Sequence, residues 1–163
     1  MSHRRTLPIA IGAAVLVTDQ VTKHIAAQAG WINYDVGTDR ALAPLTTEVG
    51  TTAVLGLVAL GLLAVVIAFA RRSTTRIFAA VAAAGIVGNR VDQLGGAKVL
   101  VRWTTDHPAV INWITLPGGY VCNLADLAIC LGLLALSVVA CVTAIRFKRA
   151  ITGRGQIRAA IPA

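Results

Sequence analysis

The sequence predicts an all-α membrane protein with four transmembrane helices joined by small extracytoplasmic loop regions. Of its 163 residues, 56% are hydrophobic and only 13% are charged, whereas about a quarter of the residues in a soluble domain are charged. Four apolar stretches each approach the roughly 20 residues that a helix needs to cross a bilayer. The predicted single domain, 1–163, contains spans at about 7–29, 52–70, 77–94 and 122–145, outer loops 30–51 and 95–121, and a basic tail 146–163.

The distribution of charge predicts the orientation of these spans. Ten of the 15 Lys and Arg residues flank the ends that four spans would place on one side, and all seven acidic residues fall toward the other side. The positive-inside rule makes the basic side the cytoplasm, so both termini are expected there. A nucleic-acid binder would not sort its charges in this way, despite the net charge of +8. The basic positions are Arg4, Arg5, Arg71, Arg72, Arg76, Arg146, Lys148, Arg149, Arg154 and Arg158.

The first span also has features of a cleavable signal peptide, because a basic start and an apolar run over 7–17 precede Ala27–Ala29. Asp19, Gln20 and Lys23 interrupt the approach to that cleavage site, and cleavage would leave the other spans with the wrong charge topology. We therefore interpret the segment as a span. Asp19 and Lys23 are four residues apart and can pair on a helix, either as an interfacial ion pair or as a brace for an outer-face site.

The third and fourth spans carry two further polar pairs in otherwise apolar surroundings. Asn89 and Asp92 are three residues apart near the outer end of the third span, and Asn123 and Asp126 have the same spacing at the start of the fourth. Residues three apart share one face of a helix. A carboxylate in a membrane-length apolar segment is costly and marks a functional site with a partner. Three polar pairs that converge on one layer predict such a site.

The sequence shows no pattern of residues that would bind a metal ion or a nucleotide cofactor. The three cysteines (Cys122, Cys130 and Cys141) lack metal-ligand spacing and lie in or beside one apolar segment, so we interpret them as small core residues. The chain has neither a His-rich cluster nor a phosphate-binding loop. We expect no metal and no cofactor.

Three motifs in chain order resemble those of the bacterial lipoprotein signal peptidase family, signal peptidase II, of which this chain looks like a divergent member. They are TDQVTK (Thr18–Lys23), GNRVDQ (Gly88–Gln93) and VCNLADLAI (Val121–Ile129). The family pattern is D-Q-x-x-K, G-N-x-x-D-R, V-V-D-F and F-N-x-A-D, on the same four-span layout. The resemblance implies an intramembrane aspartic endopeptidase that removes signal peptides from diacylglyceryl-modified prolipoproteins.

The resemblance also implies the roles of individual residues. One catalytic aspartate is Asp126, and the position of the second, within Val110–Ile114, is occupied by Asn112. Other positions depart from the pattern: the family's Arg is Gln93 and its Phe before the last Asn is Cys122. Its outer-loop motif has no clear counterpart, and the nearest stretch is Thr38–Leu42. The supporting positions that are kept are Asn89, Asp92, Asn123, Asp19 and Lys23.

The asparagine at position 112 bears directly on the reaction. Two close carboxylates that share one proton supply both the base and the acid for amide hydrolysis, and the amide of Asn112 cannot accept the proton. General acid–base catalysis contributes 10²–10⁴-fold, so we expect a substantial loss of rate. Asp106 in the same outer loop is a possible substitute acid, although a residue that initiates a turn before Pro108 is the simpler interpretation.

Three hypotheses follow. The chain is a working peptidase that uses Asp126 with an unusual partner, a catalytically impaired homologue that binds prolipoprotein signal helices or lipids without cleaving them, or an unrelated four-span carrier. The third ranks last because the inner halves of all four spans lack ionisable residues. The expected partners are diacylglyceryl prolipoprotein signal peptides and membrane lipids, with no nucleic acid, for a monomer in the bacterial cytoplasmic (inner) membrane.

Overall fold

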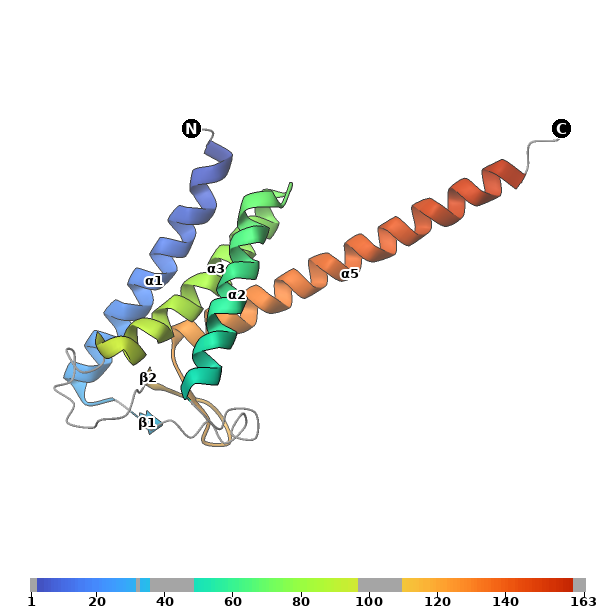
Figure 1. Cartoon of the computed structure of the whole chain (residues 1–163). Coiled ribbons are helices and arrows are strands. Elements are labelled where there is room, and N and C mark those ends of the chain that lie inside the picture. The colour runs from blue at the N-terminus through green and yellow to red at the C-terminus, as the bar shows by residue number, and fades with distance from the viewer. Residues whose placement is uncertain (1–2, 32, 36–48, 97–109, 160–163) are drawn as a thin grey trace.

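The computed structural model describes residues 3–31, 33–35, 49–96 and 110–159. Four helices dominate it (Figure 1). They are α1 (His3–Ala29), α2 (Val49–Phe69), α3 (Ser73–Val91) and α5 (Leu124–Ala159).

Helix α3 is the centre of the fold, since α1, α2 and α5 all pack against it. Small residues make this close packing possible: Ala79 and Ala82 of α3 are fully buried. Across the α3–α5 contact, a Cβ added at Gly132 would lie 2.8 Å from the Ala82 backbone nitrogen. Interfaces of small residues are typical of helices that pack in lipid, where backbones must approach closely to gain dispersion energy.

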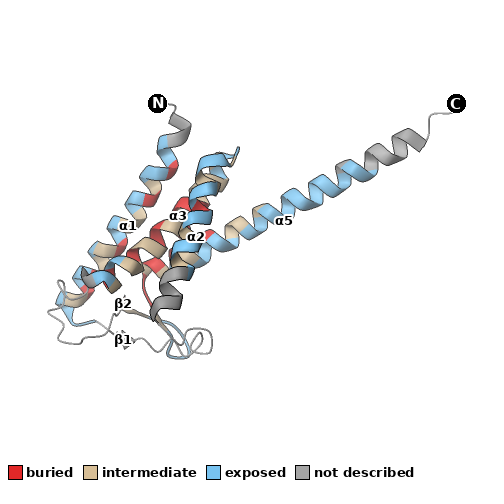
Figure 2. Cartoon of the chain, viewed as in Figure 1, coloured by how far each residue is buried: buried red, intermediate tan, exposed pale blue. Residues whose placement is uncertain are grey.

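Much of the helical surface is exposed, as Figure 2 shows, and it carries many large apolar side chains. Large apolar side chains such as Leu57 and Phe69 face outward with 69% and 79% of their surface exposed. By contrast, Asp19, Lys23 and Asp92 are at most 1% exposed. Charged residues are almost never fully buried unless they are paired, so these three residues are expected to have partners inside the fold.

The predicted outer loops contain short strands that join distant parts of the chain. Strand β1 (Asn33–Asp35) pairs antiparallel with β2 (Val110–Asn112), with Asn33 opposite Asn112. Strands β3 (Ile114–Thr115) and β4 (Val121–Cys122) form a hairpin. Gly118 and Gly119 have φ values of 91° and 81° in its turn, a region that glycine enters without a steric penalty. The sequence did not resolve the secondary structure of the outer loops. The described helices confirm a mostly helical fold, to which two small β-ladders are added.

Helix boundaries differ from the predicted spans mainly at the C-terminus. Helix α5 continues to Ala159, well past the predicted end of the fourth span at 145. In the described part of the chain, Leu124–Arg149 is the one helical segment with both the length and the apolarity for a membrane crossing. Leu55–Phe69 is apolar but shorter. At its C-terminal end, α3 continues directly into a π-helical turn, η2 (Asp92–Gly96).

Candidate active site

The candidate site is built on the first turn of α5. Asn123 immediately precedes the helix, and its Oδ1 accepts a hydrogen bond from the Asp126 backbone N–H at 3.0 Å. In return, Asp126 Oδ2 accepts the Asn123 backbone N–H, also at 3.0 Å. This reciprocal arrangement is a capping box, which satisfies backbone donors that a helix N-terminus leaves without partners. The spacing of Asn123 and Asp126 therefore fixes both the start of the helix and the orientation of the carboxylate.

Asp19 of α1 supports the same helix end from a distant part of the chain. Its Oδ1 accepts the Ala125 backbone N–H at 2.8 Å, and its Oδ2 pairs with Lys23 Nζ at 2.7 Å. Helix α3 allows this approach because position 88 is glycine. A Cβ at Gly88 would lie 2.7 Å from Asp19 Oδ2.

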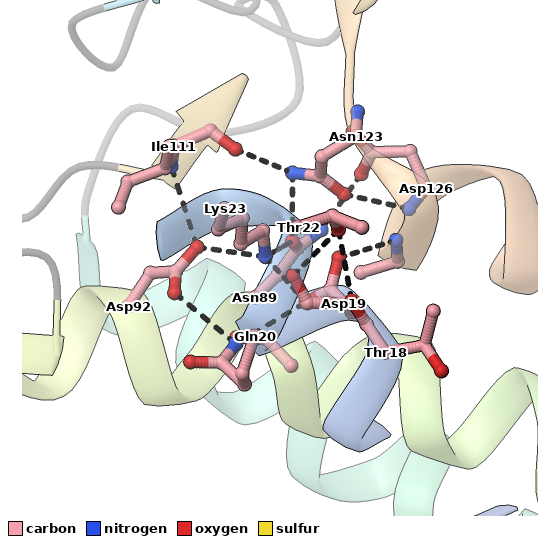
Figure 3. Close-up of polar contacts among 12 residues, drawn as sticks. Thr18, Asp19, Gln20, Thr22, Lys23, Asn89, Asp92, Ile111, Asn123 and Asp126 are labelled. Carbon is pink, nitrogen blue, oxygen red and sulfur yellow. Dashed lines mark hydrogen bonds and ion pairs between the residues drawn. The ribbon is translucent and has the colours of Figure 1, made fainter. Parts of the chain in front are cut away.

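Lys23 is fully buried and connects α1 to α3 (Figure 3). Besides Asp19, its Nζ contacts Asp92 Oδ2 at 2.8 Å and Asn89 Oδ1 at 3.2 Å. Three acceptors match the three protons of the ammonium group. Asp92 Oδ2 also accepts the backbone N–H of Ile111 at 3.3 Å, so the ion pair holds strand β2 in place. Because both side chains of the Asp19–Lys23 pair are buried, the geometry favours the brace over the interfacial ion pair.

Asn89 links Lys23 to Asp126 through hydrogen bonds. Its Oδ1 accepts from Lys23 Nζ and from Asn123 Nδ2, the latter at 3.1 Å. An amide oxygen that accepts two hydrogen bonds fixes the direction of the amide nitrogen. Asn89 Nδ2 donates to Asp126 Oδ1 at 2.7 Å. Both oxygens of Asp126 are thus positioned by neutral donors, Asn89 and the Asn123 backbone.

Asn112 lies at the edge of the same network. Asn123 Nδ2 donates to Asn112 Oδ1 at 2.8 Å and to the Ile111 carbonyl at 3.2 Å. The position predicted for the second catalytic carboxylate is therefore next to the Asp126 cluster, but it holds an amide. Asp106, the predicted substitute acid, lies outside the described residues, as does the Thr38–Leu42 segment.

The structure brings together seven of the predicted residues from three helices and a strand. They are Asp19, Lys23, Asn89, Asp92, Asn112, Asn123 and Asp126. Sequence reasoning gave no role to Gln20, whose Nε2 donates to Asp19 Oδ2 and to the Gly88 carbonyl, both at 3.2 Å. Its place in the D-Q-x-x-K motif was the available signal. Gln93 also has a partner, since Arg90 Nη1 donates to Gln93 Oε1 at 2.5 Å.

The chemistry open to this cluster depends on how each carboxylate is partnered. Asp19 and Asp92 share one cationic partner, because both contact the ammonium group of Lys23. The Asp126 carboxylate forms no salt bridge within the described residues and accepts hydrogen bonds from uncharged groups. Of the three, it is the one placed to exchange a proton with a reacting molecule, and general base catalysis needs such a group.

Comparisons with known proteins agree with this picture. Two solved structures, each described as a bacterial membrane enzyme determined by the in meso method, match with a TM-score of 0.64. The first, at 1.9 Å resolution, is 18% identical in sequence, and the match covers 83% of this chain and 92% of that one. The second, at 2.3 Å resolution, is 19% identical, with coverage of 85% and 88%. The TM-scores and the coverage establish a shared fold.

The family comparison is more specific. No curated protein matches the sequence. The model of the family described as signal peptidase (SPase) II, Peptidase_A8, matches residues 11–142, a range that contains every motif of the cluster described above. The chain therefore belongs to the signal peptidase II family.

Proposed function

We propose that the protein is a lipoprotein signal peptidase of the bacterial inner membrane, in which Asp126 alone carries the proton during hydrolysis. The substrate would be a diacylglyceryl-modified prolipoprotein, cut before its lipid-bearing cysteine. Family membership supports this substrate class. The observation that carries the proposal is the fixed position of Asp126, held by Asn89 and the Asn123 backbone beside Asn112.

The proposal includes four spans with both termini in the cytoplasm. The apolar exterior of the described helices supports insertion in lipid. The α2–α3 turn contains Arg71 and Arg72, and α5 contains Arg146 and Arg149 beyond its apolar part. By the positive-inside rule these ends are cytoplasmic, which places Asp126 toward the outer surface, where a translocated prolipoprotein presents its modified cysteine.

A single carboxylate can complete the reaction in two proton transfers. Asp126 would remove a proton from a water molecule as that water attacks the scissile carbonyl carbon. When the C–N bond breaks, the same carboxyl group would return the proton to the leaving amine. Asn112 Oδ1 accepts a hydrogen bond from Asn123 Nδ2, and its Nδ2 would donate to the substrate carbonyl oxygen. An amide donor stabilises the developing oxyanion but cannot replace a shared proton.

The direct test is cleavage of a diacylglyceryl prolipoprotein by purified protein in lipid. Wild type is expected to cut slowly, and Asp126→Ala is expected to abolish cleavage. The matched control is Ser137→Ala, an exposed residue of the same helix whose hydroxyl donates only to its own helix at Leu133. Cleavage that survives in Asp126→Ala would refute the proposed role of Asp126.

Asn112 supports a second candidate function: binding of prolipoprotein signal helices without cleavage. Asn112→Asp restores the pair of carboxylates and is expected to raise the cleavage rate by about 10²–10⁴-fold, the usual contribution of a general acid or base. If wild type crosslinks to the prolipoprotein but cuts nothing, while Asn112→Asp cuts it, the binding function is correct. If wild type cleaves and Asp106→Ala abolishes the activity, Asp106 is the second acid.

A further inference from the structure

A groove lies at the opposite end of the helices from Asp126. It has a volume of about 740 Å³ and opens between the α2–α3 turn and α5. Helix α3 has 19 residues, or about 28 Å at 1.5 Å per residue, and it separates this groove from Asn89 and Asp92. In Figure 1, α5 diverges from α2 and α3 as it leaves the core. The lining residues are Val66, Arg71, Arg72, Thr75, Leu136, Val139, Ala140, Thr143, Ala144 and Phe147.

One wall of the groove is a continuous apolar face of α5. Its lining positions run from Leu136 to Phe147 in steps of three or four residues, the spacing that keeps side chains on one side of a helix. The polar member of this face is Thr143, and its hydroxyl donates to the Val139 carbonyl at 2.7 Å. The wall therefore presents hydrocarbon, with the small residues Ala140 and Ala144 giving it depth.

The rim of the groove is cationic. Arg71 and Arg72 lie in the turn between α2 and α3, and both are exposed. Their neighbour Arg76 is engaged differently, because its Nε donates to the Ala70 carbonyl at 2.7 Å and so closes the end of α2. Both salt bridges among the described residues use Lys23. No carboxylate of the described residues therefore pairs with Arg71 or Arg72.

We propose that this groove binds one anionic glycerophospholipid, with the phosphate on Arg71 and Arg72 and an acyl chain along Leu136–Phe147. Guanidinium groups bind phosphate with paired, charge-assisted hydrogen bonds. Basic pockets between membrane helices on the cytoplasmic side are known to hold anionic lipid head groups. The combination of a cationic rim and an apolar wall matches the two halves of such a lipid, whereas a second copy of this chain would bring further positive charge to the rim.

The site is independent of the peptidase reaction, since none of its lining residues contacts the Asp126 cluster. It requires only that the chain be inserted in a membrane. The lipid would fill the space that opens where α5 leaves α2 and α3, and would fix the angle between them.

The test is lipid binding by native mass spectrometry of the full chain released from detergent. Phosphatidylglycerol and phosphatidylcholine with identical acyl chains are titrated separately. Wild type is expected to retain one phosphatidylglycerol in preference to phosphatidylcholine. The double variant Arg71→Gln/Arg72→Gln is expected to bind phosphatidylglycerol about 25-fold more weakly, at about fivefold per arginine.

The matched control, Lys148→Gln/Arg149→Gln, removes the same charge from exposed positions of α5 that do not line the groove, and is expected to bind like wild type. Ala140→Trp fills the groove without changing the charge and is expected to weaken binding of both lipids. Equal affinity of wild type for the two lipids would overturn the proposal, as would equal losses in the two double variants. A dimer that Ala140→Trp dissociates would assign the groove to self-association instead.

Discussion

Two asparagine–aspartate pairs with the same spacing have different surroundings in this protein. Asn89 and Asp92 end α3, whereas Asn123 and Asp126 begin α5. Asp92 pairs with the buried Lys23 at 2.8 Å, while Asp126 accepts hydrogen bonds from an amide and a backbone N–H. The first carboxylate therefore has a cationic partner inside the protein, whereas the second has neutral donors among the described residues.

The difference teaches that sequence spacing locates a polar site but does not assign the roles within it. Both aspartates are three residues after an asparagine, and both cap backbone donors. What distinguishes them is a single lysine from another helix. We therefore expect Lys23 and Asp92 to stabilise the fold and Asp126 to act in the reaction.

The largest effect on stability is expected from Lys23→Met. The substitution leaves Asp19 and Asp92 buried without a cation, and breaking a buried ion pair in this way costs about 3–5 kcal/mol. Unfolding in detergent, followed by circular dichroism, measures the loss. Lys148→Met, at an exposed position of α5, is the control and is expected to change stability by less than about 0.5 kcal/mol.

A compensated variant sharpens the same comparison. Replacing both carboxylates in the Lys23→Met background, by Asp19→Asn and Asp92→Asn, removes the uncompensated charges. Part of the lost stability is expected to return, because neutral replacement of a complete buried ion cluster is tolerated better than removal of one partner. A triple variant less stable than Lys23→Met would show that the geometry of the cluster matters more than its charge.

Gly88→Ala is expected to have an intermediate effect of about 1–3 kcal/mol, the usual cost of overpacking. The added methyl group would collide with Asp19 Oδ2 and displace it from Lys23 and from the Ala125 N–H. Thermal unfolding measures the change. Gly61→Ala is the control, since nothing lies within 4 Å of its Cβ position, and alanine there is expected to stabilise α2 by about 0.5–1 kcal/mol.

The smallest effect on stability is expected from Asp126→Asn, at about 1 kcal/mol. An amide has a single acceptor oxygen, so one of the two hydrogen bonds to Asp126 is lost, and a typical bond contributes about this much. Cleavage of the prolipoprotein is nevertheless expected to disappear. A stability loss as large as that of Lys23→Met would mean that Asp126 is as structural as Asp92.

Much of this site could be predicted from the sequence, because charged residues in apolar segments need partners and few partners were available. Asp19, Lys23, Asn89 and Asp126 converge as expected. The contribution of Ile111 could not be predicted, since it donates through its backbone N–H and any residue type can do that. The pairing of β1 with β2 could not be predicted from the sequence either, because three-residue strands leave no periodic pattern.

The bond between Asp19 and the Ala125 N–H has a consequence for biosynthesis. Its two ends are 106 residues apart, and a ribosome adding about 5–20 residues per second needs roughly 5–20 s to cover that distance. Until then Asp19 and Lys23 can pair with each other and with the polar groups of α3 and η2, but the first turn of α5 does not exist. The Asp126 carboxylate thus reaches its position only when the last helix docks on the ion pair that the earlier helices have already formed.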